Sequence, residues 1–195
     1  MRKLGLLLLT CVLVLSILSC RPKTQESKDD AVVETVELNQ DALGAGTIDN
    51  NDTLPGKTVV EKYGDNQAKM VAFYKVDENG QLTDEKYREV YYYDSTHYKY
   101  IEGNLDQSRR DGDWYAYHKN GNLCTEAHYV NGREEGEYKV YHDNGYLYYC
   151  GNFKNGLKEG EWKLYDEQGR LMYSQLYENG TLKETREPNN NNNKK

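Results

Sequence analysis

Apolar and polar residues alternate along most of the chain after residue 56, and Asn-Gly pairs interrupt the alternation at short intervals. Alternation with a period of two predicts β-strands. Asn-Gly predicts tight type I′ hairpin turns, because both residues tolerate the positive φ that this turn requires. The pairs occur at 79–80, 120–121, 131–132, 144–145, 155–156 and 179–180, and Gln168-Gly169 takes their place once. The pattern therefore predicts a meander of antiparallel strands joined by short turns.

The alternating pattern repeats with a period of 24 residues. From residue 120 onward, successive turns are separated alternately by 11 and 13 residues, so each unit contains two strands. Equivalent positions carry similar residues: Trp114, Tyr138 and Trp162; Tyr117, Tyr141 and Tyr165; Leu123, Leu147 and Leu171; Tyr129, Phe153 and Tyr177. A repeat of this length indicates a repeat architecture. We predict an all-β fold, an elongated single-layer antiparallel sheet of tandem β-hairpin repeats.

The three best-formed units predict the positions of individual strands. The expected strand pairs are 113–118 with 122–130, 137–142 with 146–154, and 161–166 with 170–177. By the period of two, Leu123 should share a face of the sheet with Tyr129, whereas Tyr138 and Tyr141 should lie on opposite faces. Both faces should therefore carry aromatic side chains. The glycines between the strands are interpreted as turn residues, namely Gly112, Gly136 and Gly160.

Composition divides the chain into four segments. Residues 1–19 form a predicted signal peptide, and residues 20–56 contain too little apolar surface to offset the entropy of ordering them, which predicts a disordered linker. Residues 57–187 hold the hairpin repeats, which become regular only after residue 105. Residues 188–195 are rich in Asn and Lys and are predicted to form a disordered tail.

The N-terminal residues have the composition of a targeting segment. Arg2 and Lys3 precede an apolar run that is too short for a comfortable membrane-spanning helix and has the length of a signal-peptide core. The run ends in Ile17-Leu18-Ser19-Cys20, which resembles the lipobox of bacterial lipoproteins. That resemblance implies that Cys20 becomes the lipidated first residue of the mature protein. The alternative is an ordinary signal peptide with an incidental cysteine.

The same resemblance implies a location. Several acyl chains, such as palmitate, hold a protein to a membrane more firmly than a single chain does. We therefore expect a lipid-anchored protein of the bacterial cell envelope. In lipoproteins of this type, Asp after the lipidated cysteine is associated with retention in the inner membrane, and this chain has Arg21 there. The expected location is the outer membrane.

Charge narrows the class of partner. The formal net charge is −7, with 32 acidic and 25 basic residues. Nucleic acid needs a basic surface that neutralises its phosphates, so it is not expected as a partner, and an anionic bilayer is not expected to bind the folded part. Tyr occurs 19 times, and its apolar ring with a polar tip suits a surface that is only half buried.

Two cysteines, Cys124 and Cys150, remain after the predicted cleavage before Cys20. The repeat places them on strands separated by a third strand, about 9.6 Å apart. A disulfide requires Cα atoms within about 7 Å of each other. Two free thiols are therefore predicted.

No residue pattern in the chain predicts catalysis. The sequence contains no nucleophile-and-base constellation, no glycine-rich phosphate loop before a helix and no metal-ligand spacing. His118 and His142 are equivalent positions two strands apart, which is too far for one shared metal ion, and they are interpreted as surface histidines with satisfied hydrogen bonds. We expect no enzymatic activity, no cofactor and no bound metal.

The repeated aromatic residues are the candidate binding surface. Tyr and Trp are enriched among the residues that dominate binding at protein interfaces. The predicted surface consists of Trp114, Tyr117, Tyr138, Tyr141, Trp162 and Tyr165. The alternative is that these rings only cover the sheet.

The spacing of these residues is similar to a known repeat. Gly-x-Trp/Tyr-x-x-Tyr-x-x-x-Gly-x-Leu, followed by Tyr/Phe-x-Asn-Gly, resembles the MORN-repeat family, and most closely its bacterial antitoxin-like variant repeats, over residues 105–182. The resemblance implies an elongated sheet of hairpins that contacts proteins or lipids, with no fixed catalytic residues. We expect a protein-binding scaffold of the envelope. The alternatives are an antitoxin or immunity protein that neutralises a cognate toxin, and a module that binds cell-surface glycans.

Overall fold

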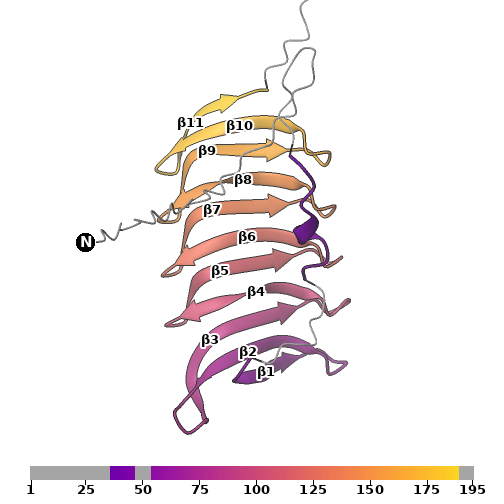
Figure 1. The fold of residues 1–195 in the computed structure, drawn as a ribbon, viewed down its shortest axis with the longest axis vertical. Coiled ribbons are helices and arrows are strands. Elements are labelled where there is room, and N and C mark those ends of the chain that lie inside the picture. Colours follow the sequence, from indigo (N-terminus) through magenta and orange to yellow (C-terminus); the bar gives the residue numbers. More distant parts are fainter. Residues whose placement is uncertain (1–35, 47–53, 189–195) are drawn as a thin grey trace, which may run out of the picture.

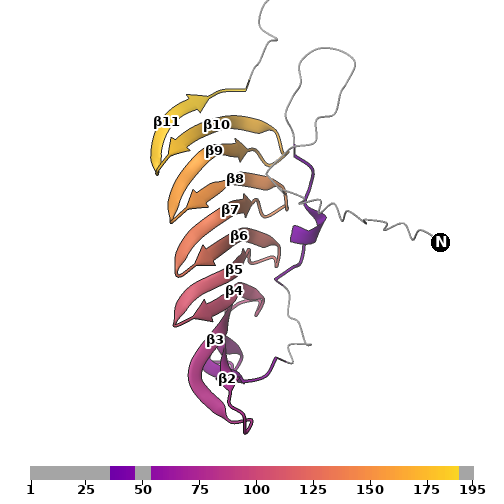
Figure 2. The same ribbon diagram turned by 60° about the vertical axis from the view of Figure 1, so that its left-hand side comes forward.

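The computed structural model describes residues 36–46 and 54–188 of the chain (Figure 1). In this part, eleven strands form one sheet, and each strand is paired with the next strand of the sequence. The predicted all-β fold, a single layer of tandem antiparallel hairpins, is confirmed (Figures 1 and 2). The strands are β1 (Lys57–Lys62), β2 (Ala68–Val76), β3 (Leu82–Tyr92), β4 (Lys99–Asp106), β5 (Arg109–Tyr117), β6 (Leu123–Val130), β7 (Arg133–Tyr141), β8 (Leu147–Lys154), β9 (Leu157–Tyr165), β10 (Leu171–Glu178) and β11 (Thr181–Arg186).

Several predictions concern residues that the structure does not describe. The signal peptide, the lipidation site Cys20 and residues 189–195 of the tail all lie outside the described residues. Within residues 36–46 and 54–188, the structure contains no helix with the length and apolarity needed to span a bilayer.

The two cysteines of the repeat domain lie where the repeat predicted them. Cys124 is on β6 and Cys150 is on β8, with β7 between them in the sheet. Both thiols are free, so the prediction that they form no disulfide is confirmed.

Two kinds of turn alternate along the sheet. At Asn131-Gly132 and its two equivalents in the later repeats, both residues have positive φ, as the predicted type I′ turn requires. In the longer turns 118–122, 142–146 and 166–170, only the glycine has positive φ, and its N–H donates to the carbonyl three residues earlier. The type I′ prediction is therefore wrong for the longer turns, which are type I turns closed by a left-handed glycine.

The glycines of a second repeated set lie inside strands, which corrects their interpretation as turn residues. They are Gly112 in β5, Gly136 in β7 and Gly160 in β9, with φ of 76°, 76° and 72°. Around each of them, three residues of the strand face a single residue of the preceding strand. This is a bulge whose left-handed position glycine adopts without strain. The three strands consequently begin earlier than predicted.

In the hairpins β3–β4, β5–β6, β7–β8 and β9–β10, the second residue of the later strand is an extra residue. These residues interrupt the register of the even-numbered strands, and they are Tyr100, Cys124, Tyr148 and Met172. An extra residue exchanges the two faces for the side chains beyond it. Leu123 therefore packs with Tyr117, whereas Tyr129 packs with Trp114 on the other side of the sheet. The prediction that Leu123 and Tyr129 share a face is wrong for this reason.

Hydrophobic clusters cover both sides of the repeat region. One side carries Tyr117, Leu123, Tyr141, Leu147, Cys150 and Tyr165. The other side carries Trp114, Ala127 and Tyr129 with the partly buried Ile101, Leu105 and Tyr138. The single layer is thus stabilised by its own large side chains on each face, and we call the second side the tryptophan face.

Residues 36–46 cross the strands beside the turns that follow β5, β7 and β9 (Figures 1 and 2). We call this segment the strap and the side of the sheet that it covers the strap face. The strap contains one 3₁₀ turn, η1 (Gln40–Ala42), and Ala42 is completely buried among the tyrosines of the strap face. The prediction of a disordered linker over residues 20–56 is therefore wrong for residues 36–46, because this segment finds backbone partners in turns far away in the sequence.

Candidate functional site

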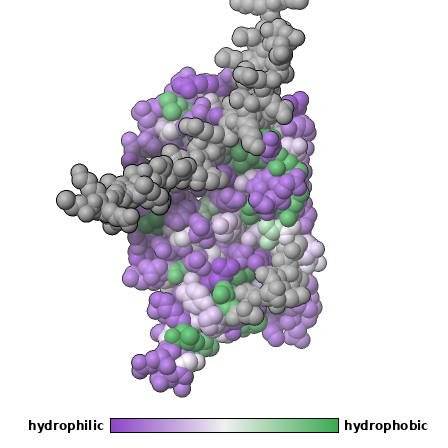
Figure 3. Space-filling model, viewed as in Figure 1, coloured by the Kyte–Doolittle hydropathy of each residue, from purple (hydrophilic) through white to green (hydrophobic). Residues whose placement is uncertain are grey.

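The predicted binding residues divide between the two faces of the sheet. Tyr117, Tyr141 and Tyr165 are the last residues of β5, β7 and β9, and all three are buried on the strap face. The hydroxyl of Tyr117 donates a hydrogen bond to Glu102, and that of Tyr141 donates to Glu126 at 3.2 Å. These tyrosines belong to the core under the strap, so this half of the predicted binding surface is covered by the chain itself. The side of the molecule drawn in Figure 3 is mostly hydrophilic, with apolar side chains in small separate patches.

Glu102 is a buried carboxylate that holds Tyr117 in place. Arg88 Nη2 lies 2.6 Å from one carboxylate oxygen, and Lys99 Nζ lies 3.1 Å from the other. Burial, together with the negative charge of Glu102, raises the pKa of the Tyr117 phenol above its usual value. Arg88, Lys99 and Tyr117 thus occupy both oxygens of the Glu102 carboxylate, so this carboxylate is not directed at a ligand.

The tryptophan face carries the other three predicted residues. Trp114 is 2% exposed, Trp162 is 1% exposed and Tyr138 is half-buried. The ring centres of Tyr138 and Trp162 are 5.9 Å apart. The tryptophans are therefore core residues, which agrees with the alternative that these rings cover the sheet. A single-layer sheet has no second layer to cover it, so its largest rings do so.

Two basic side chains cover these rings from outside. The guanidinium carbon of Arg110 is 4.1 Å from the ring centre of Trp114, and Lys158 Nζ is 4.6 Å from that of Trp162. Lys158 also donates a hydrogen bond of 2.6 Å to the hydroxyl of Tyr149, and burial raises the pKa of that phenol. Ring faces covered in this way are not open to stack on a ligand.

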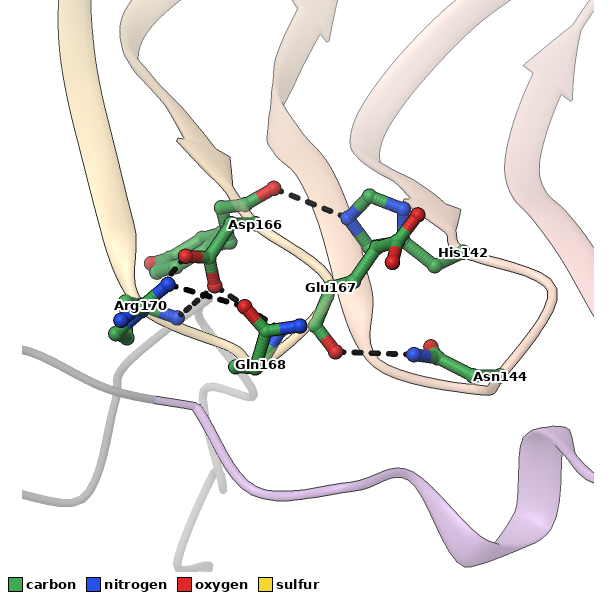
Figure 4. Close-up of polar contacts among 7 residues, drawn as sticks. His142, Asn144, Asp166, Glu167, Gln168 and Arg170 are labelled. Atoms are coloured by element: carbon green, nitrogen blue, oxygen red, sulfur yellow. Dashed lines mark hydrogen bonds and ion pairs between the residues drawn. The ribbon is translucent and has the colours of Figure 1, made fainter.

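Each longer turn is bound to the next one by its own side chains (Figure 4). His142 Nε2 lies 3.1 Å from the carbonyl oxygen of Tyr165, so this nitrogen carries the proton, and Asn144 Nδ2 donates to the carbonyl of Glu167 at 2.9 Å. Within the last turn, Arg170 Nε lies 2.7 Å from a carboxylate oxygen of Asp166. The preceding pair of turns is joined in the same way through His118, Tyr141, Asn120 and Asp143. The interpretation of both histidines as residues with satisfied hydrogen bonds is confirmed.

Part of the exposed apolar surface lies at the extra residues of the even-numbered strands. Tyr100, Tyr148 and Met172 are 49%, 41% and 46% exposed, and Cys124 is half-buried. The four positions are 24 residues apart, so they form a line across the strands with a spacing of about 9.6 Å. We call these four residues the bulge column.

Aromatic neighbours support the bulge column from the side. The ring centre of His142 is 4.8 Å from that of Tyr148, and the ring centre of Tyr93 is 5.2 Å from that of Tyr100. A hollow of about 390 Å³ adjoins Tyr100 and is partly lined by Tyr63 and Tyr93. The column therefore presents apolar side chains that are positioned by packed residues and open to solvent, which are the properties of an anchor in a protein interface.

Sequence reasoning missed the bulge column. The signal was present, because the four positions are separated by the same step as the buried rings. It was not visible in residue type, since Tyr, Cys, Tyr and Met share no motif. Only the strand register shows that these four positions are extra residues, and the structure shows that three of them are exposed.

The described residues contain no group of three or more His, Cys, Asp or Glu side chains that could hold a metal ion. His128 Nδ1 lies 2.7 Å from a carboxylate oxygen of Asp113 in an exposed pair, and His118 and His142 contact backbone carbonyls. The lack of enzymatic activity stays a prediction.

Comparison with known families identifies the repeat. The profile of the MORN repeat variant matches three consecutive segments, residues 110–131, 134–155 and 158–179. These segments fall on the hairpins β5–β6, β7–β8 and β9–β10. Neither a curated protein nor a solved structure gives a significant match to the chain.

Proposed function

We propose that this protein, in which three tandem MORN repeat variants are present, is a non-catalytic scaffold that binds a partner protein at the bacterial cell envelope. In this proposal a lipid on Cys20 anchors the chain to the membrane, with the outer membrane as the expected location. The repeat sheet then lies outside the bilayer, where its own surface is free to bind the partner protein.

The bulge column is the observation that carries this function. Its exposed members lie on a sheet whose strands are hydrogen-bonded in register and whose longer turns are bound to one another, so their relative positions are fixed. A surface that is ordered before binding loses little conformational entropy on association. Tyr and Met side chains are also well suited to apolar protein contacts.

The partner that fits this surface presents apolar side chains in a line. Neighbouring column residues are about 9.6 Å apart, which is close to the rise of three residues in an extended chain or of two turns of an α-helix. The net charge of −7 disfavours nucleic acid as the partner.

A triple variant in the bulge column tests the proposed function. Replacing Tyr100, Tyr148 and Met172 by Ser should reduce capture of the partner from detergent-solubilised envelopes at least ten-fold. The unfolding midpoint of the variant should change little, because nearly half of each residue is exposed and none belongs to a buried cluster. Capture is measured by quantitative mass spectrometry against the unmodified chain.

The matched control changes three equally exposed apolar residues elsewhere on the sheet, namely Val130, Leu157 and Leu182 to Ser. This control should capture the same partner as the unmodified chain. Equal loss in both triple variants, or no loss in the column variant, would contradict the assignment of the binding surface.

The lipid anchor is tested separately. The unmodified chain should remain in the membrane fraction after a high-salt wash, and its mature N-terminal peptide should carry the mass of acyl chains on Cys20. The Cys20→Ala variant should lack that mass and should no longer yield the lipidated mature form. An unmodified cysteine within a soluble, cleaved wild-type protein would instead indicate an ordinary signal peptide.

The other candidate functions have less support. A toxin is one class of protein that the bulge column would accommodate, but no described feature of the column selects a toxin over other partners. Glycan binding would require exposed ring faces, and Trp114 and Trp162 are buried under Arg110 and Lys158. We therefore do not propose a sugar-binding site on these rings.

A further inference from the structure

The strap is bound by equivalent atoms of three successive repeats. The backbone N–H groups of Val36, Asn39 and Gly46 donate to the carbonyl oxygens of the turn glycines Gly169, Gly145 and Gly121, at 3.0, 3.4 and 2.8 Å. These glycines are separated by the repeat step of 24 residues. The strap face therefore offers one backbone acceptor per repeat to a chain that crosses the strands.

The spacing of these acceptors matches an extended chain. Three residues of extended chain, such as Val36 to Asn39, rise by about 10 Å, and one repeat advances by about 9.6 Å. Between Asn39 and Gly46 the strap uses seven residues for one repeat, because the 3₁₀ turn η1 takes up the excess length and brings Ala42 into the core. Val36 and Asn39, which are three residues apart, reach the acceptors of two successive repeats without such a turn. A fully extended peptide can therefore meet one acceptor with every third residue.

Small residues let the strap pass over the tyrosines of the strap face. Ala42 is completely buried in the cluster that contains Tyr117, Tyr141 and Tyr165. A Cβ atom on Gly46 would lie 2.5 Å from a ring carbon of Tyr117, which is too close for any side chain. The strap face thus accepts only a segment that has small residues over the tyrosines, in addition to an extended backbone.

The strap is also separable from the sheet. All pairings between neighbouring strands are made without it. Within the strap only Ala42 and Gly46 are buried, while Leu43 is exposed. A segment with so little buried apolar surface opens locally at a low free energy compared with the strands beneath it. Its departure would uncover the three acceptors and the buried tyrosines.

From these observations we propose that the strap face is a peptide-binding groove, and that residues 36–46 are its intramolecular ligand. The groove consists of the carbonyls of Gly121, Gly145 and Gly169 with the rings of Tyr117, Tyr141 and Tyr165. Its other ligand is an extended segment of a partner protein that has Gly or Ala over the tyrosines and competes with the strap. This inference is independent of the bulge column.

The test uses the full mature protein in detergent and a fluorescent peptide with the sequence of residues 35–46. In the Gly46→Leu variant the new side chain should displace the strap, so amide hydrogen exchange over residues 36–46 should accelerate at least ten-fold. Fluorescence anisotropy should show that the peptide binds this variant at least ten-fold more tightly than the unmodified chain, whose own strap competes at high effective concentration. A peptide that carries the same Gly46→Leu change should bind neither protein.

Ala42→Trp is a second variant that displaces the strap at another point, and circular dichroism checks that the sheet is intact in both variants. Equal peptide affinity for variant and unmodified chains would overturn the proposal. So would failure of the peptide to bind a variant whose strap exchanges rapidly. Unchanged exchange of the strap in both variants would contradict the packing on which the groove is based.

Discussion

Replacement of Trp162 by Ala is expected to lower the free energy of unfolding by about 3–5 kcal/mol. Trp162 is 1% exposed and is the centre of the aromatic cluster on the tryptophan face. Its ring centre lies between 4.8 and 6.4 Å from those of Tyr138, Tyr149, Phe153 and Tyr177. Truncation leaves a cavity that a single-layer sheet cannot close from above. Urea unfolding followed by far-ultraviolet circular dichroism measures the loss.

Two phenylalanine variants provide the matched control. The indole nitrogen of Trp162 has no hydrogen-bond partner among the described residues, whereas that of Trp114 donates to the carbonyl of Asn104 at 2.8 Å. Trp162→Phe should therefore cost less than Trp114→Phe by about 1 kcal/mol, the usual contribution of one hydrogen bond. A loss below about 1 kcal/mol in Trp162→Ala would contradict the role of this ring as the centre of the core.

Gly151→Ala should lower the free energy of unfolding by about 1–3 kcal/mol, although the change adds only one methyl group. The indole ring of Trp162 lies directly on Gly151, and a Cβ atom there would stand far inside contact distance of the ring. The ring and the two strands must shift to accept the methyl group. Thermal and urea unfolding of the full chain measure the effect.

The neighbouring repeat provides a rescue for this variant. The position equivalent to Gly151 is Ala127, and its partner across the strands is Tyr138 rather than a tryptophan. Changing Trp162 to Tyr in the Gly151→Ala background recreates that pair. The double variant should be more stable than the sum of the two single changes predicts by at least about 1 kcal/mol. Strictly additive changes would show that the ring and the glycine do not constrain each other.

A small residue paired with a large ring explains why the repeats tolerate different residues at equivalent positions. Gly103 lies under Trp114 as Gly151 lies under Trp162, and both positions would clash if a Cβ atom were added. The middle repeat replaces the pair by Ala and Tyr. The summed side-chain volume of the two paired residues is therefore conserved, rather than the volume at each position. A substitution in one member of the pair alone should lower the free energy of unfolding.

The two surfaces that we propose for partners, the strap face and the bulge column, differ in how accessible they are. The bulge column is open, and its residues are held by packed neighbours. The groove of the strap face is filled by the chain itself. A partner at the column would bind without rearrangement, whereas a partner at the groove would first have to displace residues 36–46.

The amino-acid sequence by itself determined the repeat and the shorter of its two kinds of turn. Asn-Gly at 131–132, 155–156 and 179–180 closes hairpins whose conformation depends on two residues only, so local chemistry was sufficient. The 24-residue step gave the strand order, because each hairpin pairs with its neighbour in sequence. The separation of Cys124 and Cys150 followed from that order.

Only the tertiary structure decided which side chains are covered. The extra residue at Cys124 exchanges the faces of β6, and the hydrophobic pattern continues through it without an interruption, so strict alternation placed Leu123 wrongly. The strap lies outside the repeats, and its partners Gly121 and Gly145 are remote in sequence. Its binding depends on acceptors that exist only after the turns have formed and aligned. Burial of the tyrosines and exposure of the bulge column are therefore properties of the assembled sheet, since each requires contacts between segments that no local pattern relates.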